Sequence, residues 1–131
     1  GCGPVAHSDG DALLHAVTDA LLGAVGEPDI GQLFPNTDPR HESQDSAVFL
    51  EAAAARVRDR GYELLNLDAV VVLEEPKLGP IKEQIRGRIA ALLRVHPSQV
   101  NVKGKTHESV DAVGEGRAIE THVVALLARR A

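Results

Sequence analysis

Two carboxylates and an imidazole are evenly spaced near the start of the chain. Asp11, His15 and Asp19 follow one another at intervals of four residues, so a helix would place them along one stripe of its surface. Such a stripe can ligate a divalent metal ion or orient the hydroxyls of a sugar. The same residues also suit a helix N-terminus whose acids complement the helix dipole, with one exposed histidine. Because His7 and Asp9 lie close by, we favour the chemical interpretation.

Two later clusters combine phosphate-binding groups with turn-forming residues. Residues 29–31 and 34–39 are rich in Asp, Asn, Gly and Pro, a composition that Asx-turns alone can explain. Residues 103–108 follow a predicted strand and supply lysines, a hydroxyl and a carboxylate. Phosphate and magnesium together require such groups, although a charged loop has the same composition. The clusters together indicate an enzyme that acts on a phosphate or diphosphate.

Hydrophobic periodicity predicts the elements that must position these clusters. The predicted helices span residues 11–25, 45–60 and 81–95, and the predicted strands span residues 62–74, 100–103 and 118–127. Ser8, Asp9 or Asp11 can cap the first helix, and Gly61 ends the second. The segment 29–44 is predicted to be a long loop, because it is rich in turn-forming residues.

The order of these elements favours an α/β, or layered α+β, domain in which three helices cover one face of a small sheet. We expect a single domain over residues 1–131, since a chain of 131 residues that is 44% apolar can bury one modest core. So few elements leave the other face of the sheet without cover from the same chain. That face would meet a second subunit in a closed dimer or trimer, unless it is polar and solvated.

Composition excludes several classes of protein. The formal charge of −5 disfavours binding to nucleic acid, which needs a basic face. Cys2 is the single cysteine, so an internal disulfide framework and a cysteine-based zinc site are both excluded. The apolar run 69–73 is too short to cross a bilayer, and no charged-then-apolar signal segment opens the chain. We therefore expect a cytoplasmic protein that binds neither nucleic acid nor membrane.

A series of short motifs runs through nearly the whole chain. The most specific is the block His7-Ser8-Asp9-Gly10-Asp11, which is followed by His15. The other blocks lie at residues 18–24, 29–31, 34–35, 37–39, 45–46, 61–62, 66, 76–77 and 100–103. In type and order these motifs resemble the 2-C-methyl-D-erythritol 2,4-cyclodiphosphate synthase family, and the chain is identified as a member of that family.

The resemblance implies a homotrimer that packs through its sheets, with active sites at the subunit interfaces. It implies the substrate 4-diphosphocytidyl-2-C-methyl-D-erythritol 2-phosphate, whose 2-phosphate attacks the β-phosphorus and expels cytidine monophosphate (CMP). The product, 2-C-methyl-D-erythritol 2,4-cyclodiphosphate, belongs to the non-mevalonate route to isoprenoid precursors. The implied cofactors are Zn²⁺, or another divalent transition metal, and Mg²⁺ or Mn²⁺. Because the phosphoryl transfer is intramolecular, such an enzyme chiefly folds its substrate and shields charge.

The same resemblance assigns metal-binding and catalytic roles. His15 matches a zinc ligand, and Glu108 matches the carboxylate that binds magnesium. Catalytic roles are implied for Glu108, Thr106 and His7. Asp19 matches a structural helix residue, so the resemblance implies that His15 is the one metal ligand in the stripe.

Substrate-binding roles are also implied by the resemblance. The residues concerned are His7, Ser8, Asp11, Asp29, Gly31, Asp38, Lys77, Leu78 and Thr106. The first three match residues that hold the methylerythritol phosphate, the next two match ribose contacts, and Lys77 with Leu78 matches the cytosine pocket. Asp38 lies in the substrate loop, and Thr106 matches a hydroxyl that touches the diphosphate.

Four features depart from the family pattern. No Asp-x-His pair, which supplies the other zinc ligands in the family, occurs before His7. We expect this pair upstream in the natural protein, and we expect poor solubility without it, because a sheet edge would be unpaired. Asn36 replaces a usual aspartate, and residues 105–108 replace a run of threonines. Residues 114–118 permute the family's Gly-Arg-x-Glu-Gly pattern, which lines an axial cavity for an isoprenoid diphosphate in relatives.

Two other functions stay open at this point. One is a catalytically impaired trimeric protein that binds a nucleotide or diphosphate on the same fold, and zinc content with CMP release would distinguish it. The other is a phosphatase or metal hydrolase built on Asp11, His15 and Asp19. The hydrolase predicts that a change at Asp19 abolishes activity while a change at Lys77 has little effect.

Overall fold

Three long helices and a three-stranded sheet make up most of the part of the chain that the structure describes. The computed structural model describes residues 4–33, 42–73, 79–106 and 120–130. The helices are α1 (Pro4–Ala24), α2 (Ile30–Leu33), α3 (Glu42–Asp59), α4 (Gly79–Leu93) and the 3-10 helix η2 (Pro97–Gln99), and the strands are β1 (Tyr62–Leu73), β2 (Val100–Thr106) and β3 (Glu120–Arg129). Within these ranges, none of the helices has the length and apolar character needed to span a membrane.

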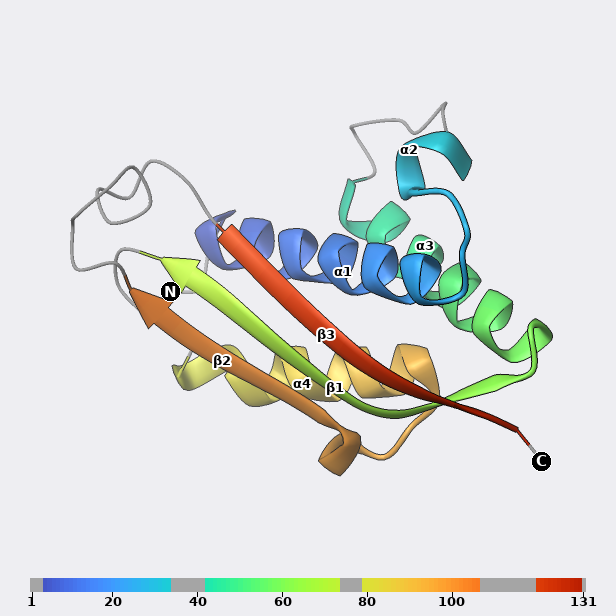
Figure 1. Ribbon diagram of the computed structural model, residues 1–131. Coiled ribbons are helices and arrows are strands. Elements are labelled where there is room, and N and C mark those ends of the chain that lie inside the picture. Colours follow the sequence, from blue (N-terminus) through green and yellow to red (C-terminus); the bar gives the residue numbers. More distant parts are fainter. Residues whose placement is uncertain (1–3, 34–41, 74–78, 107–119, 131) are drawn as a thin grey trace.

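The sheet has the strand order β2-β1-β3 (Figure 1). Strands β1 and β2 are parallel, with Leu67 opposite Val100, and α4 lies between them in the chain. Strands β1 and β3 are antiparallel, with an irregular register between Leu64 and Asn66. Because β1 continues beside it, β2 runs past its predicted end at Lys103.

The helices cover one face of the sheet, as predicted (Figure 1). Helix α1 lies against β3, α4 lies against β2, and α3 packs on α1 and α4. Alternate residues of β1 point into this layer, and Leu67, Ala69 and Val71 are at most 1% exposed. The helices contribute aliphatic side chains at helical spacing: Leu14, Val17, Leu21, Leu50, Ala53, Val57, Ile89 and Leu93. The core is therefore largely aliphatic, as the composition predicts.

The first helix begins earlier than predicted. It starts at Pro4 rather than near Asp11, so the prediction that Ser8, Asp9 or Asp11 caps this helix is wrong. Proline is favoured in the first turn of a helix, where its missing N–H has no partner to lose. The first specific motif is therefore helical and belongs to the same rigid element as His15.

The predicted loop 29–44 is wrong in part, because it contains α2 and the first residues of α3. Helix α2 forms where Oδ1 of Asp29 accepts the backbone N–H of Gln32 at 3.0 Å, which caps the helix. Residues 34–41 of this segment lie outside the described residues. The other elements agree with the predictions to within a few residues.

The long helices end on residues with positive φ. Gly26 follows α1 with φ 75°, and Gly61 follows α3 with φ 85°. At the end of α4 the same left-handed position is occupied by Arg94, with φ 59°. The N–H of Val95 there donates to the carbonyl of Ala90 at 3.0 Å, which is the pattern of a Schellman end. Glycine is the usual residue at such a position, so an arginine there is unfavourable for the backbone.

No helix covers the opposite face of the sheet in the described part of the chain (Figure 1). Exposed residues alternate along β3, and Val124 and Leu126 are 71% and 56% exposed. Beside them, Lys103 forms an ion pair with Asp68 at 2.9 Å, and Asn101 donates to the same carboxylate at 3.1 Å. This outer face therefore combines exposed apolar side chains with polar groups that satisfy one another.

Acidification is expected to weaken the fold slightly through Asp68. The hydrogen bond from Lys103 holds the pKa of Asp68 below its ordinary value, against the opposing effect of partial burial. A carboxyl whose pKa is lower in the folded state adds stability above its unfolded pKa, and that stability is lost as the pH falls through the folded pKa. Both side chains are at least 40% exposed, so the contribution stays below about 1 kcal/mol.

Urea unfolding measured from about pH 6 down to about pH 3 tests this effect, because the window spans ordinary carboxyl pKa values. We expect Asp68→Asn to lose less stability over this range than the parent protein. Asp59→Asn, at the exposed end of α3, is the control and should follow the parent. Equal losses for the parent and Asp68→Asn would contradict the prediction.

Candidate active site

Helix α1 places Asp11, His15 and Asp19 along one stripe, as their spacing predicts. Their surroundings differ, because Asp11 is 9% exposed, His15 is half-buried and Asp19 is exposed. Oδ1 of Asp19 accepts the backbone N–H of Ile30 at 3.2 Å and ties α2 to α1. Within the described ranges, no three His, Cys, Asp or Glu side chains lie close enough together to hold a metal ion. The stripe is therefore not a three-ligand metal site, and Asp19 has a structural contact.

Helix α3 holds the His15 imidazole in place. Nε2 of His15 lies 2.9 Å from Oγ of Ser46, and either atom can be the donor, depending on the tautomer. Ser46 is fully buried, and the Phe49 ring lies tilted against the imidazole with its centroid 6.2 Å away. In the sequence Ser46 is only part of a motif match. Its contact with His15 could not be predicted, because the two residues are 31 positions apart. One sequence pattern could have pointed to this contact: Ser46 and Phe49 are three residues apart, so near the start of α3 they lie one turn apart on the same face.

Removal of the Ser46 hydroxyl is expected to impair the site without unfolding the protein. For the release of CMP that the family resemblance implies, we expect Ser46→Ala to lower kcat by about ten-fold or more, the usual effect of removing a group that orients a functional histidine. KM should change little, and Ser46→Thr should recover part of the loss. Steady-state kinetics and thermal melting are the measurements.

Thr18→Val is the matched control for this change. It also removes a fully buried hydroxyl, one that donates to the carbonyl of Leu14 at 2.8 Å. If Thr18→Val and Ser46→Ala lower kcat equally, the effect comes from the loss of a buried polar group, and Ser46 has no positioning role.

Asp11 lies one turn before His15 on the same helix, and the residue is 9% exposed. Within the described residues, its carboxylate has no hydrogen bond or ion pair. Burying a carboxylate without partners is unfavourable, and a buried polar group without a partner in a native fold points to a ligand, water or ion. The site is thus arranged to receive a hydrogen-bond donor or a cation from outside this part of the chain.

Asp29 and Gly31 lie close together at the start of α2. Oδ1 of Asp29 lies 3.4 Å from the position that a Cβ on Gly31 would occupy. A Cβ at Gly31 would therefore come into van der Waals contact with this carboxylate oxygen. Asp29 itself is exposed, so its second oxygen can still accept a hydrogen bond while the first caps the helix.

Lys103 is not free to bind phosphate as its position in the sequence suggested, because it is paired with Asp68 on the outer face of the sheet. Thr106 ends β2, and His7 and Ser8 lie in the first turns of α1, but their side chains lie outside the described residues. The predicted site residues Asp38, Lys77, Leu78 and Glu108, and the departures at 36 and 114–118, also lie outside the described residues.

The backbone places the candidate residues in two regions (Figure 1). The first turns of α1, where the His7 motif begins, lie at the same end of the domain as the carboxyl ends of β1 and β2, and Thr106 ends β2. Helix α2, with Asp29 and Gly31, follows the other end of α1. The two regions are separate within one chain.

The fold is that of solved cyclodiphosphate synthases. The structure superposes on "IspF (Plasmodium falciparum) CDP complex" with a TM-score of 0.81 and 36% identity, covering 90% of this chain and 70% of that chain. A 2C-methyl-D-erythritol 2,4-cyclodiphosphate synthase from Plasmodium vivax superposes with a TM-score of 0.75 and 36% identity, covering 90% and 69%. These similarities confirm the small α+β domain.

The chain belongs to the YgbB family, whose sequence model matches residues 2–128. It is 55% identical over 125 residues to the chloroplastic 2-C-methyl-D-erythritol 2,4-cyclodiphosphate synthase of rice, covering 95% of this chain and 56% of the relative. It is 49% identical over 127 residues to the enzyme of that name from Dechloromonas aromatica, covering 97% and 79%. The chain thus spans about half the length of its plant relatives. The family resemblance in the sequence is confirmed.

Proposed function

We propose that this chain forms the catalytic domain of a 2-C-methyl-D-erythritol 2,4-cyclodiphosphate synthase. The substrate would be 4-diphosphocytidyl-2-C-methyl-D-erythritol 2-phosphate, converted to the cyclic diphosphate and CMP in the non-mevalonate pathway. The family and the relatives' names support this activity, and so does the solved complex of the Plasmodium falciparum protein with CDP. The single observation on this chain that carries the proposal is the buried Asp11 carboxylate without a described partner, one turn from His15.

The reaction needs alignment more than covalent help from the protein. An oxygen of the 2-phosphate forms a bond to the β-phosphorus, and the bond from that phosphorus to the bridging oxygen breaks. CMP leaves with the bridging oxygen and its electron pair. Holding the two phosphates of one flexible molecule in line removes much of the entropic barrier. The enzyme is accordingly a phosphorus-oxygen lyase, in which binding residues do most of the catalytic work.

Each candidate residue has a binding role in this proposal. Asp11 accepts a hydrogen bond from a hydroxyl of the methylerythritol, which would give its buried carboxylate the missing partner. His7 and Ser8 donate to the 2-phosphate, and Thr106 donates to the diphosphate. The ribose and cytosine contacts are Asp29, Gly31, Lys77 and Leu78, and Asp38 is a further substrate contact.

A metal at His15 is also part of the proposal, although the described residues do not complete a metal site. His15 presents one imidazole beside a buried carboxylate, whereas a catalytic zinc site needs three protein ligands. Zinc or another divalent transition metal would therefore need ligands from outside the described ranges. We further propose that Mg²⁺ or Mn²⁺ binds at Glu108. Metal analysis of the purified protein tests the first site, because His15→Ala should lower the bound transition metal per chain.

We propose that three copies assemble through the outer face of the sheet. The exposed Val124 and Leu126 on this face are the apolar groups that an interface would bury, and the Asp68–Lys103 pair lies next to them. Trimer assembly would also join the two separated regions of the site, with Thr106 from one subunit meeting Asp29 of another. A cytoplasmic location is part of the same proposal, whereas the plant relatives are named as chloroplastic.

Release of CMP from the substrate by the purified protein, with Mg²⁺ or Mn²⁺ present, is the experiment that tests the function. We expect Lys77→Ala to weaken nucleotide binding, seen as a rise in KM of about ten-fold, the effect of one charge-assisted contact. Asp19→Asn should change activity little, because the amide oxygen can still accept the N–H of Ile30.

The outcomes separate the other functions. Loss of activity in Asp19→Asn with little effect of Lys77→Ala would indicate a hydrolase built on the α1 stripe. Nucleotide binding without any release of CMP would indicate a catalytically impaired binding protein.

A further inference from the structure

A cavity lies at the end of the domain away from the start of α1. It has a volume of about 360 Å³, is partly open to solvent, and is lined by the carboxyl ends of α1, α3 and α4, the start of β1 and the end of β3. Its wall is apolar where Leu21, Val57, Leu64 and Leu93 line it. The volume is in the range of small-molecule sites. The cavity contains neither Asp11 nor His15, so it is distinct from the candidate active site.

Three arginines from three different elements line this cavity. They are Arg58 of α3, Arg94 after α4 and Arg130 after β3, and the one acid in the lining is Glu63. In the described part of the chain, none of the three guanidinium groups has an ion pair or a hydrogen bond. Two neighbouring arginines behave differently: Arg56 and Arg60 both contact Glu27, at 3.1 and 2.8 Å.

The positive φ of Arg94 is unfavourable for a residue that carries a side chain, so the backbone is strained at this position. The equivalent positions after α1 and α3 are Gly26 and Gly61, and glycine would relieve the strain after α4 as well. Strained non-glycine residues cluster at functional sites, where surrounding structure maintains them. An unpaired guanidinium in the lining of a cavity is a physical reason for an arginine here.

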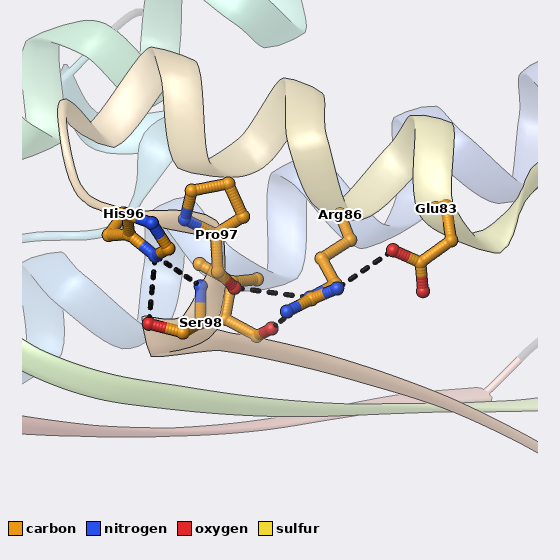
Figure 2. A network of polar contacts seen from close by, with 6 residues as sticks. Glu83, Arg86, His96, Pro97 and Ser98 are labelled. Atoms are coloured by element: carbon orange, nitrogen blue, oxygen red, sulfur yellow. Dashed lines mark hydrogen bonds and ion pairs between the residues drawn. The ribbon is translucent and has the colours of Figure 1, made fainter.

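The segment that carries this side of the cavity is rigidly held. Figure 2 shows Nδ1 of His96 within hydrogen-bond distance of the backbone N–H and the hydroxyl of Ser98, at 3.1 and 2.8 Å. Nε of Arg86 donates to the carbonyls of Pro97 and Val100, at 3.1 and 2.7 Å. The turn is therefore fixed to α4 before any ligand binds.

Gln99 fixes the same turn to β1. Its Oε1 accepts the N–H of His96 and its Nε2 donates to the carbonyl of Leu64, both at 3.0 Å. The backbone of this turn therefore needs little ordering on binding, which favours affinity.

We propose that this cavity is a binding site for a small organic phosphate, separate from the active site. Guanidinium groups bind phosphate oxygens in a bidentate manner, and three of them against one carboxylate favour a dianion over a singly charged carboxylate. The apolar wall accommodates the organic part of the ligand. This inference does not depend on the proposed cyclisation, since none of its residues belongs to that site.

Phenyl phosphate is a suitable probe, because it joins a phosphate to an apolar ring. Isothermal titration should detect one site per chain that persists with saturating CDP, with benzoate and inorganic phosphate each binding more weakly. Arg58→Ala and Arg130→Ala should each weaken binding by about ten-fold, as expected for loss of a charge-assisted hydrogen bond. Arg56→Ala is the matched control on the same helix, and it should change the affinity by less than about two-fold.

Arg94→Gly provides a second measurement that a merely structural role would not explain. It should weaken binding of phenyl phosphate while raising the melting temperature of the ligand-free protein, because the glycine removes the backbone strain. Equal losses in Arg56→Ala and Arg58→Ala would overturn the proposal, since they would indicate nonspecific attraction. Displacement of phenyl phosphate by CDP, or no binding by the parent protein, would overturn it as well.

Discussion

Asp11→Asn is expected to lower CMP release by about ten-fold or more, because the amide oxygen accepts the hydrogen bond of a substrate hydroxyl without the negative charge that strengthens it. The same change should leave the melting temperature unchanged or raise it. Asp11 is 9% exposed and its carboxylate has no described partner, so the folded protein gains from exchanging the charge for a neutral amide. Active sites commonly retain such unfavourable groups because binding requires them. Enzyme kinetics and thermal melting on the same preparations are the measurements.

Asp59→Asn is the control, since it makes the same chemical change at an exposed position at the end of α3. It should leave CMP release unchanged. If Asp11→Asn lowers stability and activity together, Asp11 has a structural partner and the site lacks the proposed substrate contact. Full activity in Asp11→Asn would remove the observation on which the proposed function depends.

The sequence predicts the elements well because hydrophobic spacing reports burial directly. Leu14, Val17 and Leu21 repeat at helical spacing and are at most 2% exposed in α1. The run through Ala69 and Val71 forms the central strand, buried under the helices. One covered face of the sheet follows from these patterns, since three amphipathic helices must bury their apolar sides on it.

Local chemistry that competes with these patterns is harder to predict. The turn-rich segment after Pro28 gives no periodic signal, yet the Asp29 side chain caps a short helix there. Arg94 occupies a left-handed position where sequence rules expect glycine. Each case depends on one side chain or one backbone angle. Hydrophobic periodicity is judged over many residues, so it does not reveal such a single feature.

The candidate site shows the same limit at longer range. The spacing of Asp11 and His15 correctly predicts one helix stripe, but not that the carboxylate is buried and the imidazole half-buried. The contact of Ser46 with His15 depends on how α3 packs against α1. The pairing of Lys103 with Asp68 depends on the strand register. Tertiary contacts decide which charged groups are free, so sequence clusters overestimate the number of phosphate-binding groups.

Leu126→Asp is expected to convert the protein to monomers and to abolish CMP release together. Leu126 is 56% exposed on the outer face, and Val124 beside it is 71% exposed. If three copies bury this face, an aspartate there would be desolvated without a partner, which a marginal interface cannot tolerate. Activity would fall with assembly because the two regions of the site lie apart within one chain (Figure 1). Light scattering coupled to gel filtration and the CMP assay are the measurements.

Gln84→Glu also adds a negative charge at an exposed position, on α4 in the helical layer, and it should leave assembly and activity unchanged. Val124→Asp should repeat the effect of Leu126→Asp, which would show that the effect comes from loss of the interface and not from a local distortion at one residue.

A monomeric Leu126→Asp protein with full activity would show that one chain supplies a whole site. An intact trimer in both variants would show that the sheet face is solvated and that assembly uses another surface. Loss of assembly and activity together in both variants is the result that a site shared between subunits requires, because a monomer would still contain both regions but would lack a neighbour whose Thr106 could meet Asp29.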